Sequence, residues 1–255
     1  RDRSVSRGLG DVYKRQFQAY GEFARVYDMF QDNVDYQTWG KWLKQQLAAQ
    51  GITDGLVLDL GCGYGWHCKY AAEHGAKSVL GVDLSEKMLE IARQKNAAPQ
   101  IAYCCGAMED LAFSPASFDV VLSSLAFHYV RDFDALVQKI AAWLAPGGTF
   151  VFSVEHPTFT AYGSQDWYYD ENGNILHFPV DRYFYEGQRD AVFLGEHVIK
   201  YHRTLTSYVG ALLQNGFSLT DLKEPMPPQT VLHLPGMPDE MRRPMMLLLR
   251  ADKKE

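Results

Sequence analysis

The order of apolar and amphipathic stretches along the chain predicts an alternating α/β fold. Apolar runs short enough to be buried strands lie at residues 56–60, 79–83, 101–104, 118–123 and 149–154. Helical spacing of apolar positions falls between these runs, at residues 64–74, 86–93 and 133–144. Ser85 is placed to cap the second of these helices. Strands that alternate with helices predict a mostly parallel sheet with helices on both faces.

Further elements are expected on both sides of this core. Two helices are predicted before it, at residues 20–30 and 35–51. After it, Thr204 can cap a helix that Gly216 ends, and its predicted apolar face is Leu205, Tyr208, Val209, Leu212 and Leu213. The last strands are predicted at residues 217–222 and 245–249.

Residues 155–200 break the alternation and are rich in aromatic side chains. Asn172-Gly173 lies between apolar runs at 167–169 and 175–178, which is a strong short-range signal for a β-hairpin. We interpret the segment as an insertion after the fifth strand that forms a lid over the substrate. Simple filling of the core by these aromatic side chains stays open as the alternative.

A glycine-rich loop follows the first predicted strand. Asp59 stands near the strand's end, and Gly61, Gly63 and Gly65 follow at alternate positions. Without a Cβ, these residues let the backbone turn sharply and approach a ligand closely. Asp83 ends the next strand, where a carboxylate can accept hydrogen bonds from ribose hydroxyls. A dinucleotide fingerprint would need a further glycine where this chain has Trp66.

The pattern hydrophobic-hydrophobic-Asp-hydrophobic-Gly-x-Gly-x-Gly at residues 57–65 resembles the first motif of class I S-adenosylmethionine-dependent methyltransferases. Residues 65–68, 152–157 and 201–205 resemble a bacterial subgroup of small-molecule type. The resemblance implies a Rossmann-like sheet of about seven strands with an antiparallel last strand. It also implies methyl transfer to a small-molecule acceptor, with S-adenosylmethionine as the cofactor.

The same resemblance assigns cofactor-binding roles to residues in several parts of the chain. Many relatives have an acid at the position of Ala107, so Glu109 or backbone groups would serve the adenine here. The expected cofactor-binding residues are Tyr27, Asp59, Gly61, Cys62, Gly63, Gly65, Asp83, Leu84, Met88, Ala107, Met108, Glu109 and Ser124.

Charge and composition narrow the range of substrates and partners that the chain could bind. The formal net charge of −6, without any Lys/Arg run, argues against a nucleic-acid substrate. No apolar run approaches the roughly 20 residues of a membrane helix, and no metal site is predicted. The four cysteines lack zinc spacing, so we expect free thiols and a cytoplasmic location. Oligomeric state is left open.

The first sixteen residues contain five basic side chains and no apolar periodicity. Residues 11–16 resemble the translation of a sequencing adapter. We therefore expect residues 1–16 to be a disordered, adapter-derived extension, and residues 17–255 to form the methyltransferase domain.

Three polar side chains are candidates for chemistry at the acceptor. His128 follows the fourth strand and His156 the fifth, and each could act as a general base if the acceptor holds its proton at neutral pH. Arg203 could hold a substrate carboxylate or phosphate as a bidentate fork. Each could instead be a structural residue. An NAD-dependent oxidoreductase and a non-catalytic cofactor-binding or interaction protein remain as alternative functions.

Overall fold

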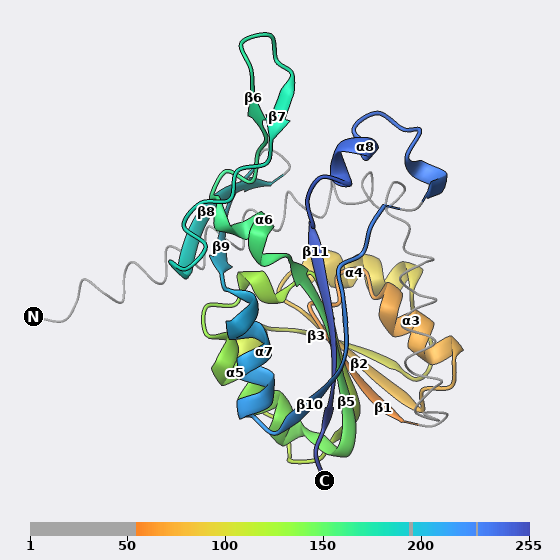
Figure 1. The fold of residues 1–255 in the computed structure, drawn as a ribbon. Helices are drawn as coiled ribbons and strands as arrows, with labels where there is room; N and C mark the ends of the chain where they lie inside the picture. Colours follow the sequence, from red (N-terminus) through yellow and green to blue (C-terminus); the bar gives the residue numbers. More distant parts are fainter. Residues whose placement is uncertain (1–54, 194–195, 228) are drawn as a thin grey trace, which may run out of the picture. The chain divides into compact units, whose positions relative to one another are not determined.

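The computed structural model describes residues 55–193, 196–227 and 229–255 (Figure 1). The segment 1–16, the helices predicted before residue 52 and Tyr27 lie outside the described residues. The chain divides into two compact units. Among the described residues, the first unit holds 55–112, Phe118–Val120, 192–193 and 196–198, and the second holds Phe113–Ser117, 121–191 and 199–255 without residue 228.

The central sheet has seven strands in the order β10-β11-β5-β4-β1-β2-β3 (Figure 1). Their bounds are β1 Leu56–Leu60, β2 Ser78–Asp83, β3 Ile101–Cys105, β4 Phe118–Ser124, β5 Leu144–Glu155, β10 Phe217–Lys223 and β11 Met246–Lys253. β1 pairs with β2, and β2 with β3, in parallel. β11 runs antiparallel to both of its neighbours, β10 and β5. The predicted fold class, with its antiparallel last strand, is confirmed.

The first unit follows the predicted strand–helix alternation. α3 (Trp66–Glu73) follows β1, and α4 (Glu86–Lys95) follows β2. The Ser85 hydroxyl accepts a hydrogen bond from the Met88 N–H, which confirms the predicted cap. Met88, Leu89 and Ala92 are the buried face of α4, at the helical spacing read from the sequence. A short 3₁₀ turn, η1 (Met108–Asp110), follows β3.

The second unit packs α5 (Phe133–Trp143) and α7 (Leu205–Gln214) against its strands, with the 3₁₀ turn η2 (Phe127–Tyr129) after β4. Its core is aromatic, built from Phe127, Phe133, Phe150, Phe152 and Tyr208. The Thr204 cap of α7 is confirmed, because its side chain accepts from the Ser207 N–H. The predicted apolar face is wrong at Leu213, which is 51% exposed, because Ala211 takes the buried position beside Leu212.

β5 begins earlier than predicted, directly after α5. Its pairing with β11 nevertheless starts at Thr149, the predicted first residue of the strand, and runs to Glu155. Gly147 has a φ of 71°, so the Pro-Gly-Gly stretch still contains the sharp backbone change that its composition indicates.

The insertion after β5 contains the predicted hairpin and several elements that were not predicted. β6 (Tyr168–Tyr169) and β7 (Ile175–His177) pair antiparallel around Asn172-Gly173, which confirms the hairpin. The unpredicted elements are α6 (Pro157–Ala161) and a two-stranded sheet of β8 (Gly187–Phe193) and β9 (Glu196–His202). Between β10 and β11 lie η3 (Gln229–Val231) and α8 (Met237–Glu240).

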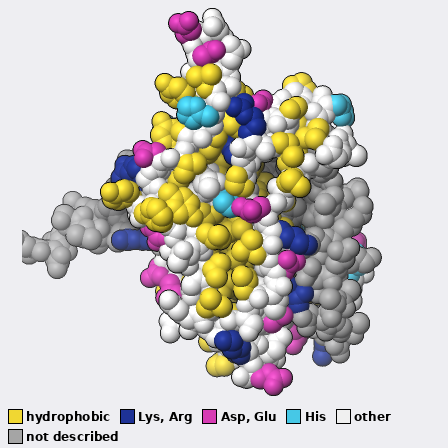
Figure 2. Space-filling model, in the orientation of Figure 1, with side chains coloured by type: hydrophobic (Ala, Val, Ile, Leu, Met, Phe, Trp, Pro, Cys, Tyr) yellow, Lys and Arg dark blue, Asp and Glu magenta, His cyan; other side chains and the backbone are white. Residues whose placement is uncertain are grey.

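Hydrophobic side chains are exposed on the face of the molecule drawn in Figure 2. In the insertion, Phe184 is 86% exposed and Tyr185 70%, so its aromatic residues do not all fill the core. None of the helices in the described ranges has the length and hydropathy that crossing a bilayer requires.

Candidate functional site

The glycine loop after β1 is held in shape by main-chain hydrogen bonds. The N–H groups of Gly61 and Cys62 both donate to the Val82 carbonyl, at 2.8 and 2.9 Å. Gly61, Gly63 and Gly65 have φ values of 74°, 52° and 75°, which L-residues with a side chain rarely adopt. The loop therefore ties the end of β1 to the end of β2 and opens directly into α3.

Asp83 connects three segments at the end of β2. Its Oδ2 accepts from the Gly63 N–H and its Oδ1 from the Ser85 N–H, both at 2.8 Å. Its main-chain carbonyl accepts from the Gly106 N–H at 3.0 Å, which brings the residues after β3 to the same place. Burial raises the pKa of the Asp83 carboxyl, and the backbone donors oppose that rise.

Asp59 is a fully buried carboxylate beside the same loop. Its Oδ2 accepts from the Cys68 thiol at 3.3 Å. Its Oδ1 is buried and has no hydrogen-bond partner in the described part of the chain. Burial raises the pKa of Asp59 to about 7, and the nearby charge of Asp83 adds to the rise. Within the described ranges, β1 thus places beside the loop a buried oxygen that lacks a hydrogen-bond donor.

Tyr103, on β3, packs against the glycine loop, a role that no pattern in the sequence indicated. Its hydroxyl donates to the Asn96 carbonyl at 2.8 Å, and the Asn96 side chain donates to the Tyr64 carbonyl, also at 2.8 Å. A Cβ placed on Gly65 would lie 2.0 Å from the Tyr103 hydroxyl. Gly65 is therefore required both by its φ and by the ring packed against it.

In the second unit, His128 lies buried in η2, behind the end of β4. Its Nδ1 accepts a hydrogen bond from the main-chain N–H of Glu155 at 3.4 Å. Burial lowers the pKa of His128 to about 4, and the charges of Lys200 and Arg203 add to that effect, while Glu155 opposes it. The imidazole is therefore neutral at pH 7, with its proton on Nε2.

The backbone turn before His128 is unusual. Leu125 has a φ of 52°, a conformation that costs a residue with a branched side chain free energy. Its N–H donates to both the carbonyl and the hydroxyl of Ser153, each at 3.0 Å, which stabilises the turn. Strained backbone conformations that the surrounding structure stabilises in this way often position functional side chains.

Glu155 is also the centre of a buried ionic group. Lys200, only 1% exposed, donates from Nζ to Glu155 Oε1 at 2.6 Å and to Gln165 Oε1 at 2.8 Å. The Gln165 amide donates to Glu155 Oε2 at 2.8 Å. Burial alone would raise the pKa of Glu155, but the interactions with His128, Lys200 and Gln165 outweigh it and lower that pKa. The sequence pointed to neither Lys200 nor Gln165.

His156 and Arg203 are occupied by structural contacts. His156 Nδ1 accepts from the Thr158 N–H and so caps α6, and its Nε2 lies 2.8 Å from Glu224 Oε1. The Arg203 guanidinium donates to the main-chain carbonyls of residues 127, 130, 131 and 201. Both of its terminal nitrogens are thus engaged, so the predicted substrate fork is replaced by a clamp on the backbone around η2.

Comparison with known proteins identifies the family. Residues 58–152 match the family profile described as "Methyltransferase domain". A solved structure of an S-adenosylmethionine-dependent methyltransferase homologue from Listeria monocytogenes is 53% identical, covers 86% of this chain and 99% of its own, and has a TM-score of 0.79. The chain belongs to the S-adenosylmethionine-dependent methyltransferases.

Two further relatives agree with this. A methyltransferase structure from Mesorhizobium loti is 40% identical over 79% of this chain and 92% of that one, with a TM-score of 0.73. A ubiquinone biosynthesis O-methyltransferase from Idiomarina loihiensis is 46% identical, but over only 40% of this chain and 44% of its own. The matched stretch therefore covers less than half the length of that enzyme. The comparisons give no support to the oxidoreductase or to the non-catalytic alternative.

The residues present in this methyltransferase fit its cofactor. Asp59 Oδ1, which has no donor among the described residues, suits an ammonium group, and a Cβ on Gly63 would meet none of their atoms within 4 Å, which leaves space beside the loop in this part of the chain. Asp83 keeps acceptor capacity for ribose hydroxyls beside the two hydrogen bonds that it already makes. Asp59, Gly63 and Asp83 are therefore the residues that would hold S-adenosylmethionine.

The other predicted cofactor residues are placed as follows. Cys62 and Met88 are buried, and Met88 packs with Tyr64 in the core of the first unit. Half-buried positions are taken by Leu84, Ala107, Met108, Glu109 and Ser124. Among the residues that the structure describes, no three His, Cys, Asp or Glu side chains are grouped to hold a metal ion.

Proposed function

We propose that this methyltransferase methylates a small molecule and that His128 binds the acceptor as a hydrogen-bond donor. The sulfonium of the cofactor supplies the activated methyl group. In-line displacement then needs mainly alignment, which can contribute about 7–11 kcal/mol. The protein contributes by holding the acceptor atom in line and by keeping water away from it.

The Glu155 N–H bond to His128 Nδ1 carries this proposal. With Nδ1 accepting, the neutral ring carries its proton on Nε2 and has no free lone pair with which to act as a base. Within the described residues, Nε2 makes no hydrogen bond. The geometry therefore favours a donor to an oxygen or nitrogen of the acceptor over the general base expected from the sequence.

A nucleic-acid acceptor is less compatible with the net charge of −6 than a small molecule is. The proposal places the enzyme in a reducing cytoplasm, since all four cysteines are free thiols and two of them, Cys62 and Cys68, are buried.

Two measurements test the proposed function. In the first, the intact protein is titrated with S-adenosylmethionine and with NAD, and Asp83→Ala is titrated in parallel. Tighter binding of NAD, or full cofactor affinity in Asp83→Ala, would contradict the cofactor site. In the second, labelled S-adenosylmethionine is incubated with a metabolite extract, and transfer of label to a small molecule is expected.

Two substitutions of His128 distinguish the loss of its hydrogen bond from the mere loss of its side chain. The amide of a glutamine at this position can donate near the place of the imidazole Nε2, whereas alanine cannot. We expect His128→Ala to lower kcat/KM about 10- to 100-fold, the effect of one hydrogen bond to a polar or charged group. His128→Gln should recover most of that loss. Equal inactivity of both variants would show that His128 acts as a base.

A further inference from the structure

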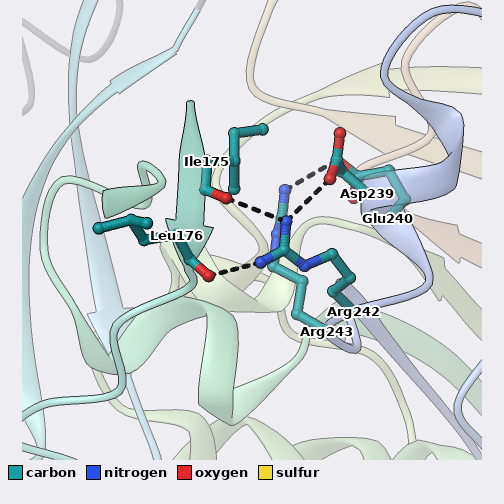
Figure 3. Close-up of polar contacts among 6 residues, drawn as sticks. All are labelled: Ile175, Leu176, Asp239, Glu240, Arg242 and Arg243. Atoms are coloured by element: carbon teal, nitrogen blue, oxygen red, sulfur yellow. Dashed lines mark hydrogen bonds and ion pairs between the residues drawn. The ribbon is translucent and has the colours of Figure 1, made fainter. Parts of the chain in front are cut away.

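The guanidinium of Arg243 is enclosed by three aromatic rings of the second unit that are far from it in sequence. Its Cζ lies 4.5 Å from the ring centre of Phe159, 4.6 Å from that of Phe178 and 4.7 Å from that of Trp167. Its Nη2 donates to Glu240 Oε1 at 2.9 Å (Figure 3). We call these five residues the Arg243 cage.

The Arg243 cage contains three buried polar atoms that have no hydrogen-bond partner among the described residues. They are Nε and Nη1 of Arg243 and Oε2 of Glu240. The Arg243 side chain is only 7% exposed and that of Glu240 18%, so bulk water does not satisfy these atoms. Buried polar groups in proteins are almost always paired with protein, water or a ligand, so these three atoms offer hydrogen-bonding capacity that the described side chains do not use.

The cage lies at the end of the sheet where the second unit carries its polar site. β11 runs antiparallel to β5, so Met246 at its start lies opposite Glu155 at the end of β5. The His156 N–H donates to the Met245 carbonyl at 2.9 Å, which fixes the segment after Arg243 at that edge. The charge of Glu155 also acts on the pKa of Arg243, which burial lowers.

We propose that the Arg243 cage binds the carboxylate of the methyl acceptor, which is a small planar organic acid. This rests on the proposed function and names its substrate class. A carboxylate supplies the acceptor oxygens that Nε and Nη1 lack, in the charge-assisted form that guanidinium groups favour. A hydroxyl or amino group on the same molecule supplies the donor that Glu240 Oε2 lacks. The three rings suit a planar body, which they can stack on or border.

Entry to the cage requires a ring to move. Trp167 and Phe178 flank the β6–β7 hairpin, so a shift of this hairpin would open one side. Arg242 holds the hairpin from outside, donating to the carbonyls of Ile175 at 3.5 Å and Leu176 at 2.6 Å (Figure 3). Its side chain is 38% exposed, pairs with Asp239 at 3.0 Å and lies 5.3 Å from the ring centre of Trp167, so Arg242 stabilises both the hairpin and one ring of the cage.

The test is calorimetric titration of the full-length protein, saturated with S-adenosylhomocysteine, with benzoate, 3-hydroxybenzoate and benzamide. Benzamide has the shape of benzoate but not its charge. We expect benzoate to bind at least tenfold more tightly than benzamide, and 3-hydroxybenzoate at least as tightly as benzoate. Arg243→Met should weaken benzoate at least tenfold, and Arg243→Lys should restore part of that loss. Arg93→Met makes the same substitution at an exposed arginine that pairs with Glu86 of α4, so it is the matched control and should bind benzoate as the wild type does.

Each outcome decides the question. Equal binding of benzoate and benzamide, or unchanged benzoate binding in Arg243→Met, would overturn the proposal. Equal loss in Arg93→Met would also overturn it, because the loss of affinity would then not depend on the cage. Affinity for S-adenosylhomocysteine and the melting temperature report on folding of each variant. If the wild type itself does not bind S-adenosylhomocysteine, the proposed function is contradicted instead.

Discussion

Replacing Asp59 by asparagine should stabilise the protein in the absence of cofactor, and the gain should depend on pH. The carboxyl has a pKa of about 7 in the folded chain, against a reference value of 3.8. Between these values the folded state binds more protons than the unfolded state, so the stability of the wild type falls as pH rises. At about 1.4 kcal/mol for each pKa unit, a shift of about three units costs ~4 kcal/mol above pH 7.

Urea denaturation of the wild type and Asp59→Asn at several pH values measures this cost. The linkage relation gives a gain for the variant of about 2 kcal/mol at pH 5 that rises to about 4 kcal/mol at pH 8. These are upper estimates, since the amide must also be buried. Asp110→Asn, at an exposed position, is the control and should show no such trend.

The same substitution should weaken cofactor binding, because an amide does not attract an ammonium group. In the wild type, binding of S-adenosylhomocysteine near pH 6.5 should release protons as Asp59 ionises, which titration in buffers of different ionisation enthalpy detects. Asp59→Asn should release fewer. A stability gain that is the same at pH 5 and pH 8, or no gain at all, would refute the reasoning.

Two further predictions concern packing and buried charge. Gly65→Ala should destabilise the protein more than Gly63→Ala. Both variants place a side chain at positive φ, which costs about 1–2 kcal/mol of stability. Only Gly65→Ala also displaces the Tyr103 ring and its hydrogen bond, which costs about 1 kcal/mol more. Equal costs in denaturant unfolding would contradict the clash. Lys200→Met should lower the stability by about 3–5 kcal/mol, because it leaves Glu155 buried without its cation. The double variant Lys200→Met/Glu155→Gln should lose much less stability. A double variant as unstable as the single one would argue against charge as the cause.

Local sequence signals predicted several elements of the fold well. The alternation around the glycine loop, the cap at Ser85 and the turn at Asn172-Gly173 depend on neighbours within a few residues, and all three are confirmed. Short elements were missed, because α6 and α8 span too few residues for a helical period to show. Proline in the first turn of each, Pro157 in α6 and Pro238 in α8, was an available signal.

The site in the second unit was harder to predict because its parts are far apart in sequence. Arg243 meets rings at positions 159, 167 and 178, and no pattern in the chain links these positions. Arg203 carries the guanidinium that a bidentate contact to a substrate needs, but the tertiary fold around η2 gives it main-chain carbonyls as partners. Lys200 likewise gains its role only through contact with Glu155, 45 residues away.

The hydrogen bonds around the glycine loop have a thermodynamic consequence for binding. Gly61, Cys62 and Gly63 donate to Val82 and Asp83 at the end of β2, so the protein's own groups hold the loop in shape. A loop that is already ordered loses little conformational entropy when it binds, so more of the contact energy shows as affinity. Calorimetry should therefore find a small entropic penalty for S-adenosylhomocysteine, and crystals with and without it should show the same loop conformation.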